Sequence, residues 1–161
     1  MEIREGGLDH PDVVVLLRAH LGEFAQLSPP ESMHALGFDA LRDRDVAFWS
    51  AWEDGALLGF GALKHLDPAH AEIKSMRTAR AHLRKGVAAA LLQRILDEAT
   101  RRGYRRLSLE TGSAREFAPA HRLYERFGFA TCGPFAGYVE DTHSVFMTRE
   151  MPSNARALRT G

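Results

Sequence analysis

Gly86 stands where a short basic loop, residues 83–85, passes into a long segment with apolar residues at helical spacing. The segment before this loop, residues 71–78, has the alternating character of a β-strand. A helix start leaves its first backbone N–H groups without partners and carries the positive end of the helix dipole. A strand, a glycine loop and a helix start in this order therefore predict a site for a phosphate or pyrophosphate group.

Two common phosphate-binding loops do not fit this stretch of sequence. A Walker A loop needs two spaced glycines followed by Lys-Ser or Lys-Thr, and both features are missing here. A dinucleotide fingerprint needs Gly-x-Gly-x-x-Gly, whereas Gly86 is the single glycine of this loop. The surroundings of the loop must therefore identify the phosphate-bearing ligand.

Three side chains outside the loop could move protons. Glu72 lies in the strand-like segment before the loop, Glu110 ends the next strand-like segment, and Tyr124 lies in a second helix-like segment. A carboxylate can accept a proton and a neutral phenol can donate one. Each residue also has a structural interpretation: the carboxylates could pair with cations such as Lys74 or Arg106, and the tyrosine could pack in the core.

Hydrophobic periodicity predicts the elements that position these residues. A helix is expected between the cap Asp9 and Ser28, short helical turns in 31–41, and further helices at 87–102 and 119–127. Strands are expected at 1–5, 46–53, 56–66, 71–78, 105–111, 129–133 and 144–151. The order β-α-α-β-β-β-α-β-α-β-β predicts an α/β protein of the α+β type, with one helix joining two parallel strands in a mixed sheet. It is not the order of a doubly wound nucleotide-binding fold.

Composition limits the classes of function. The 161 residues fit one domain, expected at 1–151, with a frayed tail at 152–161. A formal net charge of zero argues against partners such as nucleic acid or an anionic membrane. The single cysteine, Cys132, argues against disulfides, and we expect a cytoplasmic protein without a signal peptide or a membrane span. The histidines show no metal-ligand spacing, so no metal is expected.

The loop resembles a known family in its details. Gly86-Val87-Ala88 is similar to the second half of the acyl-CoA loop of the GNAT N-acetyltransferase superfamily, Gln/Arg-x-x-Gly-x-Gly/Ala, although Leu83 replaces the usual Gln or Arg. Residues 123–129 resemble the late GNAT helix with its Tyr-x-x-x-Gly-Phe ending. The resemblance covers nearly the whole chain and is nearest to the small YsnE-type branch, in which leucine is usual in this loop. The segments that carry it are 28–32, 48–53, 72–78, 82–88, 107–112 and 144–148.

The resemblance implies the GNAT acyl-CoA N-acyltransferase fold and direct transfer of an acetyl group from acetyl-CoA to a small-molecule amine. It implies that Tyr124 protonates the leaving thiolate, which a phenol of pKa ~10 can do for a thiolate of pKa ~8.5. It also implies that a backbone N–H near Met76 polarises the thioester carbonyl. The residues implied to bind coenzyme A are Met76, Arg77, Thr78, Leu83, Arg84, Lys85, Gly86, Val87, Ala88, Ala89 and Tyr124.

The sequence leaves alternatives for the catalytic base and for the residues of the acceptor pocket. We favour Glu72 over Glu110 as the base, and a mechanism without a dedicated base is a third alternative. The side chains of Arg84 and Lys85 either add charge at the pyrophosphate or are simply solvated. The acceptor pocket is expected from 29–36 and 135–143. The residues expected to bind the acceptor are Ser32, His34, Arg77 and Tyr138.

Two other classes of function are compatible with the same sequence. One is a non-catalytic module that binds or senses acyl-CoA on the same fold. The other is a structural or partner-binding protein without a cofactor. The aromatic strand at 46–53 also makes a homodimer an alternative to a monomer.

Overall fold

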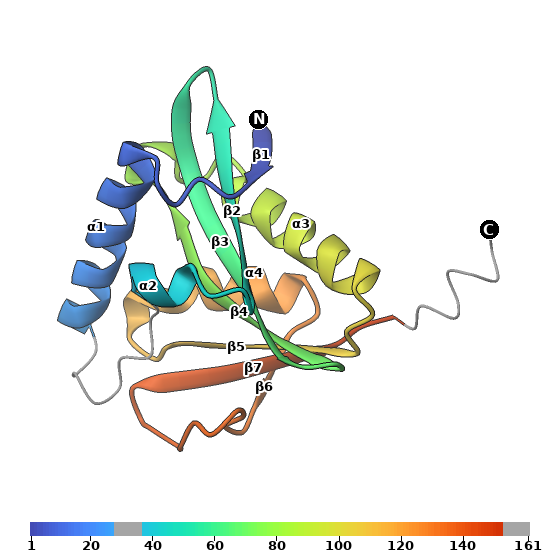
Figure 1. Cartoon of the computed structure of the whole chain (residues 1–161). Coiled ribbons are helices and arrows are strands. Elements are labelled where there is room, and N and C mark those ends of the chain that lie inside the picture. The colour runs from blue at the N-terminus through green and yellow to red at the C-terminus, as the bar shows by residue number, and fades with distance from the viewer. Residues whose placement is uncertain (28–36, 153–161) are drawn as a thin grey trace.

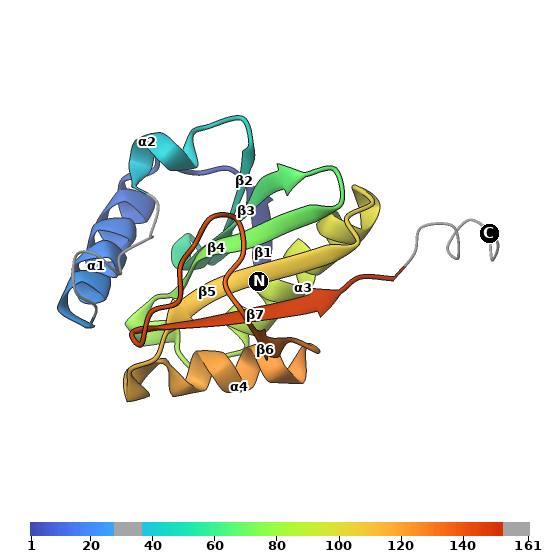
Figure 2. The same ribbon diagram turned by 90° about the horizontal axis from the view of Figure 1, so that it is seen from below.

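The computed structural model describes residues 1–27 and 37–152, and within them the chain forms a seven-stranded sheet in the order β1-β2-β3-β4-β5-β7-β6. The helices α1 and α2 cover one face of the sheet, and α3 and α4 cover the other face (Figures 1 and 2). The helices are α1 (Pro11–Leu27), α2 (Phe38–Leu41), α3 (Val87–Arg101) and α4 (Ala118–Arg126). The strands are β1 (Glu2–Glu5), β2 (Val46–Glu53), β3 (Ala56–Asp67), β4 (His70–Thr78), β5 (Arg106–Gly112), β6 (Ala130–Cys132) and β7 (Ser144–Glu150).

The element order agrees with the one expected from periodicity, and the predicted mixed sheet is confirmed. Of the predicted turns in 31–41, the structure describes α2, while 28–36 lie outside the described residues. The predicted tail also lies outside them, apart from Pro152. No helix within the described ranges is long and apolar enough to cross a membrane.

Two apolar clusters hold the helices against the sheet. On the α3 side, Leu91 and Ile95 pack with Trp49 of β2, and all three are almost fully buried. On the opposite face, Leu17 of α1 packs in a cluster with Trp52 of β2. Because side chains alternate along a strand, the two tryptophans, three residues apart, serve opposite faces. The sheet is therefore buried on both sides near its centre.

The strands β4 and β5 form the parallel pair, and they are joined through α3. Their pairing runs from His70–Arg106 to Ile73–Leu109. Beyond this point β4 continues beside β3 and β5 continues beside β7. Figure 1 shows the consequence: β2, β3 and β4 stand at a marked angle to β5 and β7. The centre of the sheet is therefore split.

A β-bulge lies in β4 where the split begins. Between the pairs Phe60–Arg77 and Ala62–Lys74, β4 has one residue more than β3. Ser75 lies in this interval with a φ of 56°, a left-handed conformation that costs energy for a residue other than glycine. The extra residue shifts the alternation of side chains by one. Arg77 therefore faces α1, as Lys74 does, although a regular strand would place the two on opposite faces.

Gly59 of β3 lies where the end of β4 approaches most closely. A Cβ atom at this position would lie 2.4 Å from the carbonyl oxygen of Arg77 and 3.2 Å from Cα of Thr78. We predict that Gly59→Ala lowers the free energy of unfolding by about 2 kcal/mol, because backbone rather than a flexible side chain would have to move. Urea denaturation measures this change.

Gly22→Ala is the matched control, because a Cβ at Gly22 in α1 meets no atom within 4 Å. Alanine favours the helix over glycine by about 1 kcal/mol, so this variant is expected to be slightly more stable than the parent protein. Parental stability in Gly59→Ala would contradict the close approach of β3 and β4.

Candidate active site

The split between β4 and β5 opens into a cavity of about 110 Å³. Lys74, Ser75 and Met76 of β4 line one side of this cavity, and Glu110 and Thr111 of β5 line the other. Backbone groups at the end of β4 have no neighbouring strand on the β5 side among the described residues. An open strand edge of this kind can pair with an extended, peptide-like molecule.

A second cavity, of about 410 Å³, adjoins the first and reaches the start of α3. Met76 and Tyr124 line both cavities, so they mark the junction. Leu83 and Ala88 line the second cavity at the glycine loop and the first turn of α3. The two cavities together lead from the predicted phosphate site to Glu110.

The start of α3 has the backbone that a phosphate site requires. Gly86 is the N-cap, in a left-handed conformation with a φ of 79°, and no side chain of the described residues caps the helix. Its first N–H groups are therefore left for water or a ligand. Lys85 is exposed, and its ammonium lies 3.1 Å from the Nδ1 atom of His82.

The residues predicted to bind coenzyme A divide into two groups. Those that line the second cavity are Met76, Arg77, Thr78, Leu83, Ala88 and Tyr124. Those that do not line it are Arg84, Lys85, Gly86, Val87 and Ala89. Val87 is 2% exposed and packs in the core, so only its backbone could serve a ligand.

Tyr124 is held at the junction by the packing of α4. Its ring meets Phe129 edge to face, with 5.8 Å between the ring centroids, and the residue is 6% exposed. Burial raises the pKa of the Tyr124 phenol above its ordinary value. The group is therefore neutral, and can donate a proton, throughout the neutral pH range.

A buried network of charges lies on β4 beside the first cavity. The ammonium of Lys74 lies 3.2 Å from a carboxylate oxygen of Glu72, and the two side chains are 7% and 2% exposed. The Tyr138 hydroxyl donates to Glu72 at 2.8 Å and accepts from Lys74 at 2.7 Å. Burial and the neighbouring Glu72 raise the pKa of the Tyr138 phenol. Of the two charged residues, Lys74 lines the cavity and Glu72 does not.

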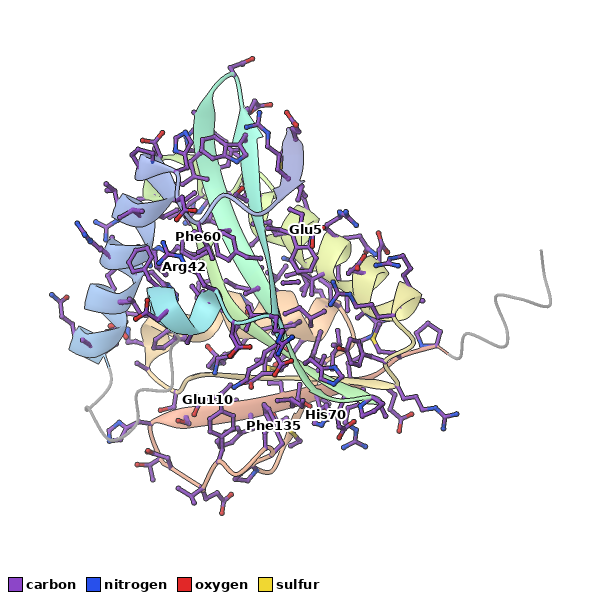
Figure 3. All side chains as sticks on the ribbon, viewed as in Figure 1. Glu5, Arg42, Phe60, His70, Glu110 and Phe135 are labelled. Atoms are coloured by element: carbon purple, nitrogen blue, oxygen red, sulfur yellow. The ribbon has the colours of Figure 1, made fainter. Side chains whose placement is uncertain are left out.

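Tyr138 reaches this network from the loop between β6 and β7. Figure 2 shows this loop arching over β5 toward β4, on the face of the sheet that carries α1 and α2. Phe135 anchors the loop, since its ring packs against those of Tyr138 and Phe146 at centroid distances of 5.3 and 5.9 Å. In Figure 3, Phe135 and His70 lie on the same side of the molecule as Glu110. The loop therefore holds Tyr138 against Glu72 and Lys74.

Ion pairs with α1 hold the end of β4. The guanidinium of Arg77 donates to the carboxylate of Glu23, and Arg80 donates to the other oxygen of Glu23 at 3.1 Å. The hydrogen bond from Arg77 holds the pKa of Glu23 below its ordinary value. In this structure Arg77 therefore pairs with a carboxylate of the chain itself. The expected contact between Arg77 and an acceptor stays a prediction.

Two buried polar atoms in the same segment lack hydrogen-bond partners among the described residues. They are Oγ of Ser75 and Nε of Arg77. A buried polar atom without a partner costs about 1–3 kcal/mol, so such atoms are rare in folded proteins. Their position beside the split fits a polar ligand there.

Two residues of this site, Lys74 and His20, are not among those expected from the sequence, and two expected ones lie outside the described residues. Ser32 and His34, with the whole of 29–36, lie outside the described residues. The sequence predicts Lys74 only as a partner for Glu72. Because Lys74 lies two residues further along the strand, on the same face as Glu72, its place in the site could have been predicted. His20 also lines the first cavity, and no pattern in the sequence links α1 to the split.

Comparisons with known proteins agree with this architecture. A family model described as acetyltransferase (GNAT) family matches residues 14–129. The uncharacterized N-acetyltransferase YsnE of Bacillus subtilis (strain 168) is 56% identical over 151 residues, which cover 94% of this chain and 100% of that protein. The uncharacterized N-acetyltransferase YedL of Escherichia coli (strain K12) is 49% identical over 152 residues, covering 94% of this chain and 96% of that protein.

A solved structure shares the fold. The crystal structure of a GNAT family acetyltransferase from Elizabethkingia anophelis with acetyl-CoA bound matches with a TM-score of 0.66 at 16% identity. The match covers 93% of this chain and 97% of that chain. The expected acyl-CoA N-acyltransferase fold is thereby confirmed.

His20 gives the site a measurable pH dependence. Burial, together with Arg77, lowers its pKa from the ordinary 6.5 to about 4. Between pH ~4 and pH ~6.5 the imidazole is protonated in the unfolded chain and neutral in the folded chain. The contribution of His20 to the free energy of unfolding is therefore complete above pH ~6.5 and is lost as the pH falls to ~4. We predict that between pH 7 and pH 4.5 the parent protein loses about 2 kcal/mol more than His20→Gln does. Denaturation of both proteins at the two pH values tests this, and equal losses would contradict a neutral imidazole at this position.

Proposed function

The chain belongs to the acetyltransferase (GNAT) family, and from this premise we propose that it transfers the acetyl group of acetyl-CoA directly to the amine of a small molecule. The observation that carries the proposal is the split between β4 and β5. Along its two adjoining cavities lie an uncapped helix start, an open strand edge, a neutral phenol and a carboxylate. These are the groups that binding a thioester and acylating an amine require.

Coenzyme A would be held along the second cavity. The backbone N–H groups from Gly86 to Ala89 would take the pyrophosphate, because a helix start favours anions. The exposed side chains of Arg84 and Lys85 would add positive charge at the loop. The open edge of β4 at residues 76–78 would pair with the amide groups of the pantetheine arm. The partnerless Ser75 and Arg77 atoms support a polar ligand at this edge.

The reaction needs three proton movements around one acyl transfer. The acceptor ammonium loses a proton, its nitrogen forms a bond to the acetyl carbon and gives up a second proton, the carbon–sulfur bond breaks, and the thiolate gains a proton. The second nitrogen proton restores the donor that protonates the thiolate. We assign the first step to Glu110 and the last to Tyr124, which both line the first cavity. A backbone N–H near Met76 would polarise the carbonyl as the nitrogen attacks.

Glu110 suits the role of base better than Glu72 does. Glu110 lines the first cavity, whereas Glu72 is 1% exposed and its carboxylate already accepts from Lys74 and Tyr138. A base must come within hydrogen-bond reach of the proton it removes. The geometry therefore favours Glu110, in contrast to the order expected from the sequence.

Direct transfer is the route that the lining residues support. A covalent acyl-enzyme would need an activated nucleophile in the cavity. Cys132 lies on β6 at the edge of the sheet and does not line either cavity, and burial raises the pKa of its thiol. It is therefore a poor candidate for an acyl carrier.

We predict that Tyr124→Phe lowers kcat by about 100-fold or more, because the thiolate then leaves without a proton donor. The affinity for acetyl-CoA should stay within about twofold, since the ring that lines the cavity is kept. Thiol release from acetyl-CoA with a panel of small amines measures kcat, and calorimetry measures binding. The control is Tyr104→Phe, the same change at a hydroxyl that contacts His65 instead. Parental kcat in Tyr124→Phe would remove the tyrosine from the mechanism.

We predict that Glu110→Gln lowers kcat/KM by about 100-fold, measured by thiol release from acetyl-CoA with the same panel of amines. An amide cannot accept the proton of the acceptor ammonium, so this proton transfer is lost. The control is Glu125→Gln, at an exposed carboxylate on α4. A parental kcat/KM in Glu110→Gln would show that the base is another group, or that none is needed.

A further inference from the structure

The first cavity, in which we expect the acceptor, is lined by a cation and a carboxylate on neighbouring strands. From this arrangement we infer that the acceptor is an amine with a carboxylate beside it, that is, an α-amino acid or a close analogue. The inference rests on the proposed acetyl transfer and specifies its substrate class. Lys74 takes the carboxylate of the acceptor, and Glu110 faces its amine.

The strand register places the two charges side by side. Ile73 of β4 pairs with Leu109 of β5, and both point into the core on the α3 side. The next residue on each strand is therefore turned toward the α1 side. These residues are Lys74 and Glu110, and they line the first cavity just where the strands separate. One is positive and the other negative.

Lys74 is poorly explained as a stabilising residue. Burying an ion pair costs desolvation energy that the attraction between the charges often fails to repay. The chain nevertheless keeps the Glu72–Lys74 pair at 2% and 7% side-chain exposure on a central strand. Glu72 and Tyr138 both contact the ammonium, and the lysine borders the cavity. The network thus holds the positive charge of Lys74 in one position beside the first cavity.

A fixed cation selects among amines. It repels the ammonium of a simple amine or a polyamine, and it attracts a carboxylate through a charge-assisted hydrogen bond. Glu110 has the opposite preferences. A molecule with ammonium and carboxylate on neighbouring atoms matches both charges within a cavity of about 110 Å³. The other cation nearby, Arg77, pairs with Glu23 of α1 and does not line this cavity.

The test compares matched acceptors. Each common α-amino acid is assayed against its decarboxylated amine and its carboxamide, with thiol release from acetyl-CoA as the readout. The carboxylate-bearing member is expected to have a kcat/KM at least about tenfold higher, the value of one charged hydrogen bond. Decarboxylated amines or carboxamides that react equally well or better would overturn the inference and leave acetyl transfer intact.

Variants of the pair assign the preference to Lys74. Lys74→Met alone would leave the Glu72 carboxylate buried without its cation and could unfold the chain. The double variant Glu72→Gln/Lys74→Met removes both charges at similar volume, and Lys74→Arg keeps the cation. The double variant should lose the tenfold preference and keep its acetyl-CoA affinity within about twofold, whereas Lys74→Arg should retain the preference. A preference that survives in the double variant would overturn the assignment.

Binding separates failure of this inference from failure of the proposed function. If no amine releases thiol although acetyl-CoA binds, acetyl transfer is refuted, and the inference is then decided by the Tm of the CoA-bound protein. A rise in Tm with amino acids, absent with decarboxylated amines and in the double variant, would support carboxylate recognition. Equal Tm with and without amino acids would overturn it.

Discussion

The separation of β4 from β5 beyond Ile73 and Leu109 is the constraint on which the proposed site depends. Parallel strands normally stay paired because each shares hydrogen bonds with its neighbour. Here a bulge at Ser75 adds a residue to β4, and the strand follows β3 while β5 follows β7. The separation opens the cavity, leaves the edge of β4 for a ligand, and turns Arg77 toward α1. A continuous sheet would place core side chains here, with no opening between its faces.

Charge in this opening is costly, and the chain places it on rigid supports. Lys74 and Glu72 lie on a central strand, and Tyr138 joins them from a loop that Phe135 fastens to β7. Tyr124 lies on a helix packed against the core and stays neutral because burial disfavours the phenolate. Each polar group is thus held in one orientation before a substrate arrives, which reduces the reorganisation that binding and reaction require. The same burial keeps His20 uncharged beside the cavity.

Much of the fold could be predicted from the sequence, because it follows from local patterns. Helical spacing defined α3, strand alternation defined β2 to β5, and Gly86 marked the start of α3. The bulge could not be predicted, because Ser75 is an ordinary strand residue and its left-handed backbone arises from pairing with β3. The choice between Glu72 and Glu110 as the base could not be predicted either, because the two lie on neighbouring strands. What distinguishes them is the hydrogen bond from Tyr138 to Glu72, a residue 66 positions away. Contacts between such distant residues leave no periodic signal.

The central proposal is that the split in the sheet binds acetyl-CoA and presents its thioester to an amine. Calorimetric titration of the protein with acetyl-CoA tests this most directly, because it needs no knowledge of the acceptor. We predict saturable binding of one molecule per chain with a Kd in the range of about 1 μM to 1 mM, typical of enzyme substrates. Binding should weaken when a glutamate replaces Ala88 at the wall of the second cavity, because its side chain narrows the cavity and repels the pyrophosphate. The absence of saturable heat at several millimolar acetyl-CoA would contradict the proposal.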